Sequence, residues 1–163
     1  MSYIIVDANK DDLEFIVSLN KDSMPSVSEL STEKAIHLLK ISNYFRILKI
    51  KEKPIGFLNA IFSDMEFNNI NYLWFKNRYK NFIYVDRIII NKEFQNHGYG
   101  TIFYNDLINT INDDFLNIGC EINVKPYNLK SINFHKKFGF MEVGREYIEN
   151  GKKQVAYMVY KNQ

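Results

Sequence analysis

In the first third of the chain, short apolar runs alternate with stretches in which apolar residues recur at helical spacing. Short runs bounded by polar residues are typical of buried strands. Three such runs are residues 3–6, 44–50 and 55–61. Lys51–Pro54 predicts a hairpin turn between the last two. Two helices are expected, one from Asp11 or Asp12 and one from Ser31 or Thr32, because these side chains can cap the free amides of a first helical turn.

Strands and helices also alternate in the second half of the chain. Phe82–Ile90 predicts a strand, because it ends in three β-branched isoleucines. A helix is expected from Gly100, with apolar residues four apart on one face. These residues are Phe103, Leu107, Ile111 and Phe115. Cys120–Val124 and Asn128–Phe138 follow as a strand and a helix, and this order with short connections predicts a right-handed parallel crossover.

At the end of the chain, Met141–Ile148 and Lys153–Tyr160 flank Asn150–Gly151, a strong signal for a β-hairpin. Antiparallel hairpins and a parallel crossover together predict an α/β fold with a mixed sheet. Ser63–Asn81 shows no clean period but is rich in aromatic side chains. Such a long irregular segment is usually functional or mobile.

Composition and charge narrow the class of protein. The 163 residues are the length of one domain, so we expect a single domain over residues 1–163. A formal net charge of +2 argues against nucleic acid or an anionic membrane as the main partner. No apolar run is long enough to span a membrane. The lone Cys120 excludes an intramolecular disulfide and fits a reducing compartment, so a cytoplasmic location is expected.

The most informative motif is Gln95–Thr101, which follows a predicted strand and opens a predicted helix. Gly98 and Gly100 allow unusual torsions and close approach of a ligand to the backbone, and the free amides of the helix start favour an anion such as a pyrophosphate. A tight turn with a helix cap would explain the same residues. Phe103 stands where a dinucleotide fingerprint needs its third glycine, and no nucleoside-triphosphatase loop is present.

A second block, Asn128–Phe140, lies downstream. Together, the two blocks closely resemble the signatures of the GNAT N-acetyltransferase superfamily, over roughly Ile55 to Tyr160. Residues between Leu58 and Arg87 also resemble a bacterial subgroup of predicted acetyltransferases without an assigned substrate. The resemblance implies the GNAT acyl-CoA N-acyltransferase fold, in which a central mixed sheet with splayed parallel strands is flanked by helices.

The same resemblance implies where acetyl-CoA binds. The pyrophosphate would lie on the first block, that is on Gln95, Asn96, His97, Gly98, Tyr99, Gly100 and Thr101. The backbone around Ile88 and Ile90 would pair with the pantetheine amides, and Asn128 would contact the cofactor arm. His97 is a departure, because the family often has Arg or Lys there and one fixed positive charge is therefore missing.

The general acid and the general base are the two catalytic roles to assign. His135 aligns with the family's general-acid tyrosine, and an imidazole can donate a proton near neutrality. A helix histidine bonded to a backbone carbonyl or to water is the alternative. The proton would then come from water or from another tyrosine, of which Tyr127 is the nearest in sequence. Asp86 shares side-chain parity with Ile88 and Ile90 and is the candidate base, although its charge next to Arg87 can also be structural.

Three other residues could carry chemistry and need an interpretation. Glu121 is the second candidate for the base. Cys120 is expected in the core, and His37 on a helix face. Three histidines and one cysteine in no clustered pattern predict no metal site.

The sequence therefore predicts acetyl transfer from acetyl-CoA to a primary amine by direct attack in a ternary complex. The expected acceptor is a small molecule bound by the early helices and residues 67–79, and a homodimer is left open. One alternative is a CoA-binding sensor or structural domain without chemistry. Another is a protein acetylase that acts on lysines or amino termini.

Overall fold

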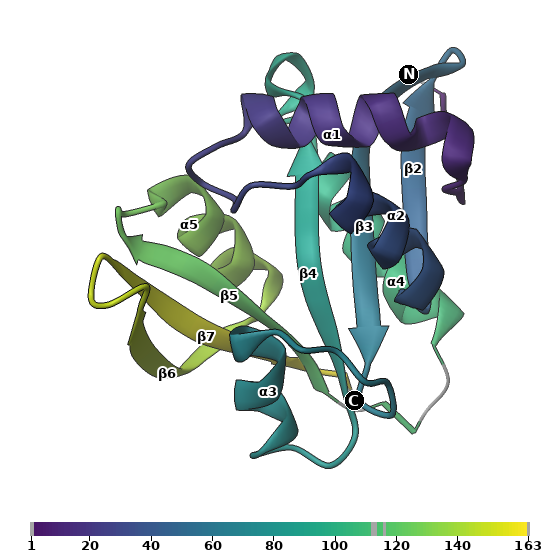
Figure 1. Cartoon of the computed structure of the whole chain (residues 1–163). Helices are drawn as coiled ribbons and strands as arrows, with labels where there is room; N and C mark the ends of the chain where they lie inside the picture. Colours follow the sequence, from purple (N-terminus) through teal and green to yellow (C-terminus); the bar gives the residue numbers. More distant parts are fainter. Residues whose placement is uncertain (1, 112–113, 116, 163) are drawn as a thin grey trace. The chain divides into compact units, whose positions relative to one another are not determined.

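The computed structural model describes residues 2–111, 114–115 and 117–162 (Figure 1). The chain divides into two compact units. The first comprises Met1–Phe62 and Val85–Ile111, and the second comprises Ser63–Tyr84 and Asn112–Gln163. The prediction of a single domain over residues 1–163 stays a prediction.

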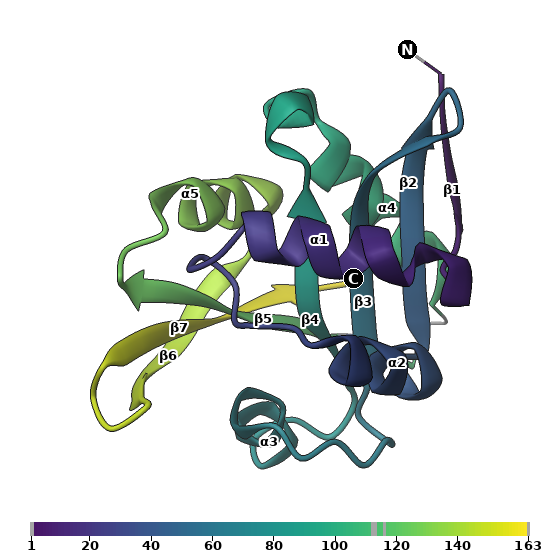
Figure 2. The ribbon, with the colours of Figure 1, turned by 45° about the horizontal axis from the view of Figure 1, so that its top comes forward.

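Three antiparallel strands form much of the first unit: β1 (Tyr3–Asp7), β2 (Tyr44–Ile50) and β3 (Lys53–Phe62). Its helices are α1 (Leu13–Asp22), α2 (Thr32–Ile41) and α4 (Tyr99–Thr110), with 3₁₀ turns at η1 (Lys10–Asp12) and η2 (Lys92–Phe94). In both views α1 and α2 lie on one side of β2 and β3, and α4 lies on the other (Figures 1 and 2).

Polar side chains start the helices of this unit. The Ser31 hydroxyl accepts a hydrogen bond from the Lys34 amide at 3.1 Å, so Ser31 rather than Thr32 caps α2. At α1, the side chain of Asn9 caps the 3₁₀ turn and Asp12 bonds back to the Asn9 amide at 2.9 Å. The predicted start is confirmed in position, since Asp12 is the N-cap residue of α1, but the Asp12 side chain makes no capping bond to this helix. The side-chain cap is Asn9, which the pattern did not single out.

Strand β4 (Phe82–Ile90) contributes to both units, since the division falls between Tyr84 and Val85. In the second unit, Phe82–Tyr84 pair in parallel with Asn117–Gly119 of β5 (Asn117–Lys125). Within the described residues this ladder ends after these three pairs.

The rest of the second unit is antiparallel. Strand β7 (Lys153–Lys161) pairs with β5 on one side and with β6 (Met141–Ile148) on the other. Helices α3 (Ile70–Lys76) and α5 (Leu129–Phe138) complete it. The strand order is β1-β2-β3-β4-β5-β7-β6, so the predicted mixed sheet and α/β class are confirmed.

The aromatic segment at residues 63–81 corrects one prediction, because it contains helix α3. Asn69 caps this helix by accepting hydrogen bonds from the amides of Asn71 and Tyr72 at 2.9 and 3.1 Å. The rings of Tyr72 and Phe75 are fully buried. Trp74 stacks on Tyr157 with ring centroids 4.0 Å apart. Much of the segment is therefore core, and its apolar residues point in several directions, which hides the helical period.

Part of this segment remains at the surface. Ile70 and Leu73 are exposed, and they line a shallow hollow of about 270 Å³ together with residues of β6 and β7. Its other lining residues are Trp74, Asn77, Arg78, Glu146, Tyr147, Ile148 and Tyr157.

A second correction concerns the helix that follows the motif. Helix α4 ends at Thr110, with Ile111 as its C-cap, so Phe115 is not on it. Strand β5 begins at Asn117, three residues before the predicted start. The predicted hairpin at Asn150–Gly151 is confirmed, with Ile148 paired to Lys153.

Candidate functional site

The loop before α4 has an unusual backbone. Asn96 and Gly98 both lie in the left-handed region, with φ of 65° and 83°. The Gln95 side-chain amide donates to the Ile90 carbonyl at 2.9 Å and ties the loop to the end of β4. The His97 ring nitrogen Nδ1 lies 2.7 Å from the Gln95 carbonyl oxygen, so this side chain turns back onto its own loop.

Gly98 is the N-cap of α4, and no side chain caps the helix there. The first intrahelical bond at this end is donated by the Ile102 amide to the Gly98 carbonyl at 3.1 Å. The amides of Tyr99, Gly100 and Thr101 thus belong to the first turn, where amides have no intrahelical acceptor. A Cβ added at Gly98 would meet nothing within 4 Å, so the space beside the loop is open. An uncapped helix start next to open space favours an anion.

Buried and partly exposed residues alternate along the second half of β4. Taken as whole residues, Asp86, Ile88 and Ile90 are partly exposed, whereas Val85 and Ile89 are buried, although the side chain of Asp86 itself is only 6% exposed. The predicted parity of Asp86 with the two isoleucines therefore agrees with the burial of the strand. Gly56 of β3 makes room for Ile90, because a Cβ there would lie 2.7 Å from the Ile90 side chain.

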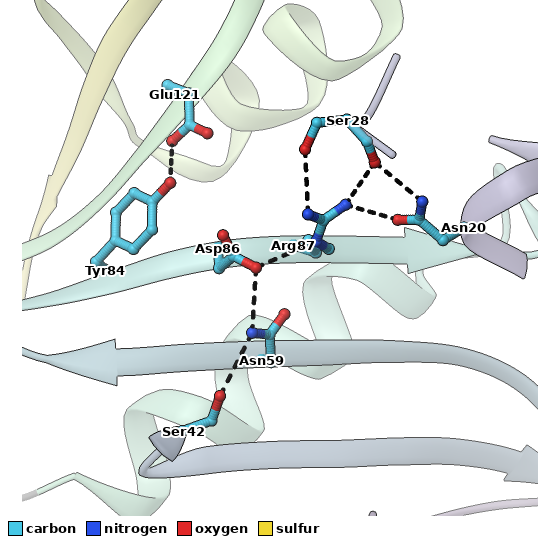
Figure 3. A network of polar contacts seen from close by, with 8 residues as sticks. All are labelled: Asn20, Ser28, Ser42, Asn59, Tyr84, Asp86, Arg87 and Glu121. Carbon is cyan, nitrogen blue, oxygen red and sulfur yellow. Dashed lines mark hydrogen bonds and ion pairs between the residues drawn. The ribbon is translucent and has the colours of Figure 1, made fainter. Parts of the chain in front are cut away.

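Asp86 belongs to a buried polar network in the first unit (Figure 3). Its Oδ2 atom accepts from Arg87 Nε at 3.2 Å and from Asn59 Nδ2 at 3.3 Å. The side chains of Asp86 and Arg87 are only 6% and 3% exposed. Asn59 is fully buried, and its Oδ1 atom has no hydrogen-bond partner within the described residues. Asn59 was not predicted, since its neighbours in sequence are apolar and give no polar signal.

Arg87 extends this network to the early helices. Its Nη1 atom donates to the Asn20 Oδ1 atom at 2.8 Å and to the Ser28 carbonyl at 2.7 Å. Its Nη2 atom donates to the Ser28 hydroxyl at 3.1 Å. The guanidinium in Figure 3 points toward these two residues, and Asp86 lies beside it. Sequence reasoning missed Asn20 and Ser28, which lie more than fifty positions from Arg87.

Glu121 lies on β5 in the second unit, where its Oε2 atom accepts a hydrogen bond from the Tyr84 hydroxyl at 2.7 Å (Figure 3). Tyr84 is fully buried, and its ring contacts those of Tyr72 and Phe75. The second candidate for the base is thus held by a core tyrosine. Burial and nearby carboxylates, including Glu121, raise the pKa of Tyr157 in the same unit.

His135 lies on α5 and is 2% exposed. Its Nδ1 atom is 2.7 Å from the Ser131 carbonyl oxygen, which can only accept, so Nδ1 carries the proton. Loss of solvation on burial lowers the pKa of His135 to about 4, although the hydrogen bond to Ser131 opposes the shift. The imidazole is therefore neutral near pH 7. This geometry favours the structural alternative for His135 over the general acid.

Asn128 and Tyr127 precede α5. The Asn128 side-chain oxygen caps the helix by accepting from the Ser131 backbone amide at 3.3 Å, and the Asn128 backbone amide donates to the Asn123 carbonyl at 2.9 Å. A local capping role therefore accounts for its side chain. Tyr127 is largely exposed. Cys120 is buried, as expected, and His37 is exposed on α2.

Metal-ligating clusters and membrane-spanning helices are both absent from the part of the chain that the structure describes. Its His, Cys, Asp and Glu side chains form no group of three that could hold a metal ion. None of its helices combines the length and apolar character needed to cross a membrane.

The chain belongs to the acetyltransferase (GNAT) family, because the model of that family matches residues 13–140, more than half of the chain. It is therefore an acyltransferase of the N-acetyltransferase type, as the two sequence motifs predicted. A search of curated proteins gave no match.

Solved structures share the fold. An acetyltransferase of the GNAT family from Streptococcus pneumoniae is 20% identical with a TM-score of 0.71, and the match covers 99% of this chain and 100% of that one. NAA60 of Arabidopsis thaliana in complex with acetyl-CoA is 14% identical with a TM-score of 0.77, over 99% and 100% of the two chains. The ribosomal-protein-S18-alanine N-acetyltransferase of Escherichia coli is 13% identical with a TM-score of 0.74, over 98% and 94%.

Proposed function

We propose that this acetyltransferase takes the acetyl group from acetyl-CoA and transfers it to a primary amine of a small acceptor by direct attack in a ternary complex. The observation that carries the proposal is the helix start at Gly98, which combines a left-handed glycine, an uncapped first turn and open space. The open side of this loop fits a pyrophosphate, since backbone amides bind it without a positive side chain. A positive charge on His97 is then not required for binding the pyrophosphate.

The proposal assigns the pyrophosphate and the pantetheine arm of acetyl-CoA to two segments of the chain. The loop at residues 95–101 would hold the pyrophosphate, and the backbone of β4 at Ile88 and Ile90 would pair with the pantetheine amides. Among the described residues, the ladder of β4 with β5 covers Phe82–Tyr84 and does not include Ile88 or Ile90. The thioester supplies an activated acetyl carbon, and the protein positions the amine against it.

Asp86 is our proposed base. Attack requires a neutral amine, so Asp86 would first take one proton from the ammonium. The amine nitrogen would then bond to the acetyl carbon, the carbon–sulfur bond would break, and CoA would leave as the thiolate. The second proton that the nitrogen loses as the amide forms would pass to water, and the thiolate would be protonated in turn. Its Oδ2 atom is engaged by Arg87 and Asn59, and within the described residues its Oδ1 atom makes no hydrogen bond. Oδ1 is thus the atom that would accept the proton. Glu121 remains the second candidate.

The thiolate needs no contribution from His135 in this proposal. A neutral imidazole whose Nδ1 proton is bonded to Ser131 is a poor proton donor. A thiol of ordinary pKa near 8.5 is a tolerable leaving group by itself. Water or the exposed Tyr127 can then protonate the sulfur.

The test combines binding and turnover. Calorimetry should show acetyl-CoA binding to the wild type, and thiol release should accelerate with at least one amine from a panel of polyamines, amino acids and a hexapeptide with a free amino terminus. Asp86→Asn keeps the shape of the side chain, so the rate should fall by about 100-fold or more while cofactor affinity is kept. Binding without turnover of any amine would support a CoA-binding sensor instead. Turnover of the peptide alone would support a protein acetylase.

A further inference from the structure

The surface where α3 meets β6 combines exposed apolar side chains with the shallow hollow described above. Ile70 and Leu73 of α3 and Tyr147 of β6 line this hollow, and they are 63%, 38% and 63% exposed. Single apolar side chains are normal on a protein surface, whereas several around one hollow are typical of an interaction site. These three side chains, together with Arg78 and Glu146, which also line the hollow, form what we call the α3–β6 patch. All five residues belong to the second unit.

The α3–β6 patch is built on a tightly packed tryptophan. Trp74 stacks on Tyr157 with ring centroids 4.0 Å apart, and the guanidinium carbon of Arg78 lies 4.1 Å from the Trp74 ring centroid. Two groups this close to one ring centroid must cover opposite faces of the ring. Arg78 Nη1 also donates to the Trp74 carbonyl at 3.0 Å, and a Cβ at Gly144 of β6 would lie 2.6 Å from the Trp74 ring. A patch that is ordered in advance loses little conformational entropy when a partner binds.

The shape of the hollow argues against a small-molecule ligand. Its volume of about 270 Å³ lies below the roughly 300–1,000 Å³ of ligand pockets, and both faces of the Trp74 ring are already covered. An added peptide strand is also disfavoured. Strand β6 is the last in the sheet order, but its pairing with β7 shifts register between Glu142 and Gly144, and such a bulge disrupts the regular edge that an added strand needs. The occupant that fits is a side chain from a folded partner.

The charges of the patch indicate which partner. Arg78 and Glu146 are exposed and of opposite sign, and within the described residues neither forms an ion pair. One charge of each sign gives no field that would attract a strongly acidic or basic partner. In a two-fold symmetric dimer the same surface faces itself, so a contact from one residue to another occurs twice. A two-fold axis at the hollow would therefore pair Arg78 with the partner's Glu146, and Glu146 with the partner's Arg78.

We propose that the α3–β6 patch is the interface of a homodimer, in which a second copy of this chain lies on the hollow. Burial of Ile70, Leu73 and Tyr147 from both copies drives association, and the two reciprocal ion pairs fix the orientation of the copies. The proposal is independent of the acceptor and of the residue that acts as base in acetyl transfer.

The first test measures self-association by sedimentation equilibrium. The wild type should show a monomer–dimer equilibrium that depends on concentration. Ile70→Asp puts a charge at the first residue of α3 and should weaken the dimer by about 30-fold or more, as expected for an interface side chain that carries much of the binding energy. Leu129→Asp is the matched control and should dimerise like the wild type, because Leu129 is the exposed first residue of α5 in the same unit. An acidic side chain is favourable in the first turn of a helix, so both variants should fold.

The second test reverses the charges. Arg78→Glu and Glu146→Arg should each dimerise less than the wild type, because like charges then face each other across the two-fold axis. An equal mixture of the two variants should form a heterodimer, since one chain carries two acidic residues at positions 78 and 146 and the other carries two basic ones. Lys137→Glu changes the net charge by the same amount as Arg78→Glu at an exposed position on α5, and it should dimerise like the wild type.

Three results would overturn the inference. A wild type without dimer up to about 1 mM would mean that the patch is not a self-interface and would leave the hollow to a different protein. Equal dimerisation of Ile70→Asp and Leu129→Asp would place the interface elsewhere on the chain. Charge-reversed variants that fail to associate when mixed would exclude the contact between positions 78 and 146. Denaturant unfolding of each variant separates weaker association from loss of folding, and Ile70→Asp decides the question if a charge-reversed variant does not fold.

Discussion

Two segments with conspicuous residue types, the loop at residues 95–101 and the aromatic segment at residues 63–81, differ in what surrounds them. In the loop, Asn96, His97 and Gly98 are exposed while Tyr99 is buried, and Gly98 faces open space. The aromatic segment contains a short helix with fully buried rings at Tyr72 and Phe75. Glycines at a helix start serve tight turns as well as anion sites, and aromatic side chains fill cores as readily as they line pockets. Residue type alone was therefore ambiguous in both segments, and the structure separates them: the first is an uncapped helix start beside open space, and the second is largely core.

The largest effect should come from the buried side of the aromatic segment. Phe75 contacts the rings of Tyr84 and Tyr157 and covers Gly119, where a Cβ would lie 2.6 Å from the Phe75 ring. Phe75→Ala should lower the free energy of unfolding by about 3–5 kcal/mol, because removing a buried ring leaves a cavity. Denaturant unfolding would measure this change.

Leu73→Ala, on the exposed side of the same helix, is the control and should cost about 1 kcal/mol or less. If Phe75→Ala were as stable as Leu73→Ala but lost acetylation of its amine, the segment would line a pocket after all. That result would make the aromatic segment at residues 63–81 part of the acceptor site rather than core.

A somewhat smaller effect is expected at the open loop. Gly98→Val places a β-branched side chain at φ of 83° and in the space that an anion would occupy. We expect the affinity for acetyl-CoA to fall by about 100-fold or more, which corresponds to about 2.7 kcal/mol. Isothermal titration calorimetry would measure it.

Gly151→Val is a close control for backbone strain. Gly151 has φ of 82°, and a Cβ there also meets nothing within 4 Å, but it lies in the β6–β7 turn. Both substitutions should therefore cost a similar 1–2 kcal/mol or so of stability, since both force a side chain into the left-handed region. Only Gly98→Val should weaken cofactor binding. Equal affinities of the two variants would remove the loop from the cofactor site.

The sequence predicted most strands and helices because their apolar residues follow a clear period or run between clear turn residues. Helix α3 was missed because its seven residues bury both Asn71 and the neighbouring rings, which leaves no polar face. The helix start at Gly98 was predicted from local residues alone, and its role in cofactor binding stays a prediction. The network around Arg87 was not, since Asn20 and Ser28 reach it only through the folding of distant segments. Local backbone requirements are visible in a sequence, and pairings across the fold are not.

The smallest of the three effects concerns His135 and its dependence on pH. Burial lowers the pKa of His135 to about 4, below its ordinary value of 6.5. An unfolded chain therefore binds a proton at this position as the pH falls below about 6.5, whereas the folded chain binds it only near pH 4. The contribution to stability is full above pH 6.5 and is lost progressively between pH 6.5 and 4. Lowering the pH from 7.5 to 5 should cost about 2 kcal/mol through this group alone.

His135→Gln should remove this part of the acid sensitivity, although the variant is less stable at pH 7.5 because a buried ring is lost. The exposed His37→Gln is the control and should keep the full pH dependence of the wild type. Denaturant unfolding of the three proteins at pH 7.5 and 5 isolates the contribution of His135 from that of the carboxylates. The same variants also test the catalytic alternative: if His135 is only structural, the alkaline limb of the rate profile is the same in all three. A limb that disappears in His135→Gln alone, with wild-type pH dependence of stability, would mean that His135 titrates near neutrality and donates the proton to the departing thiolate.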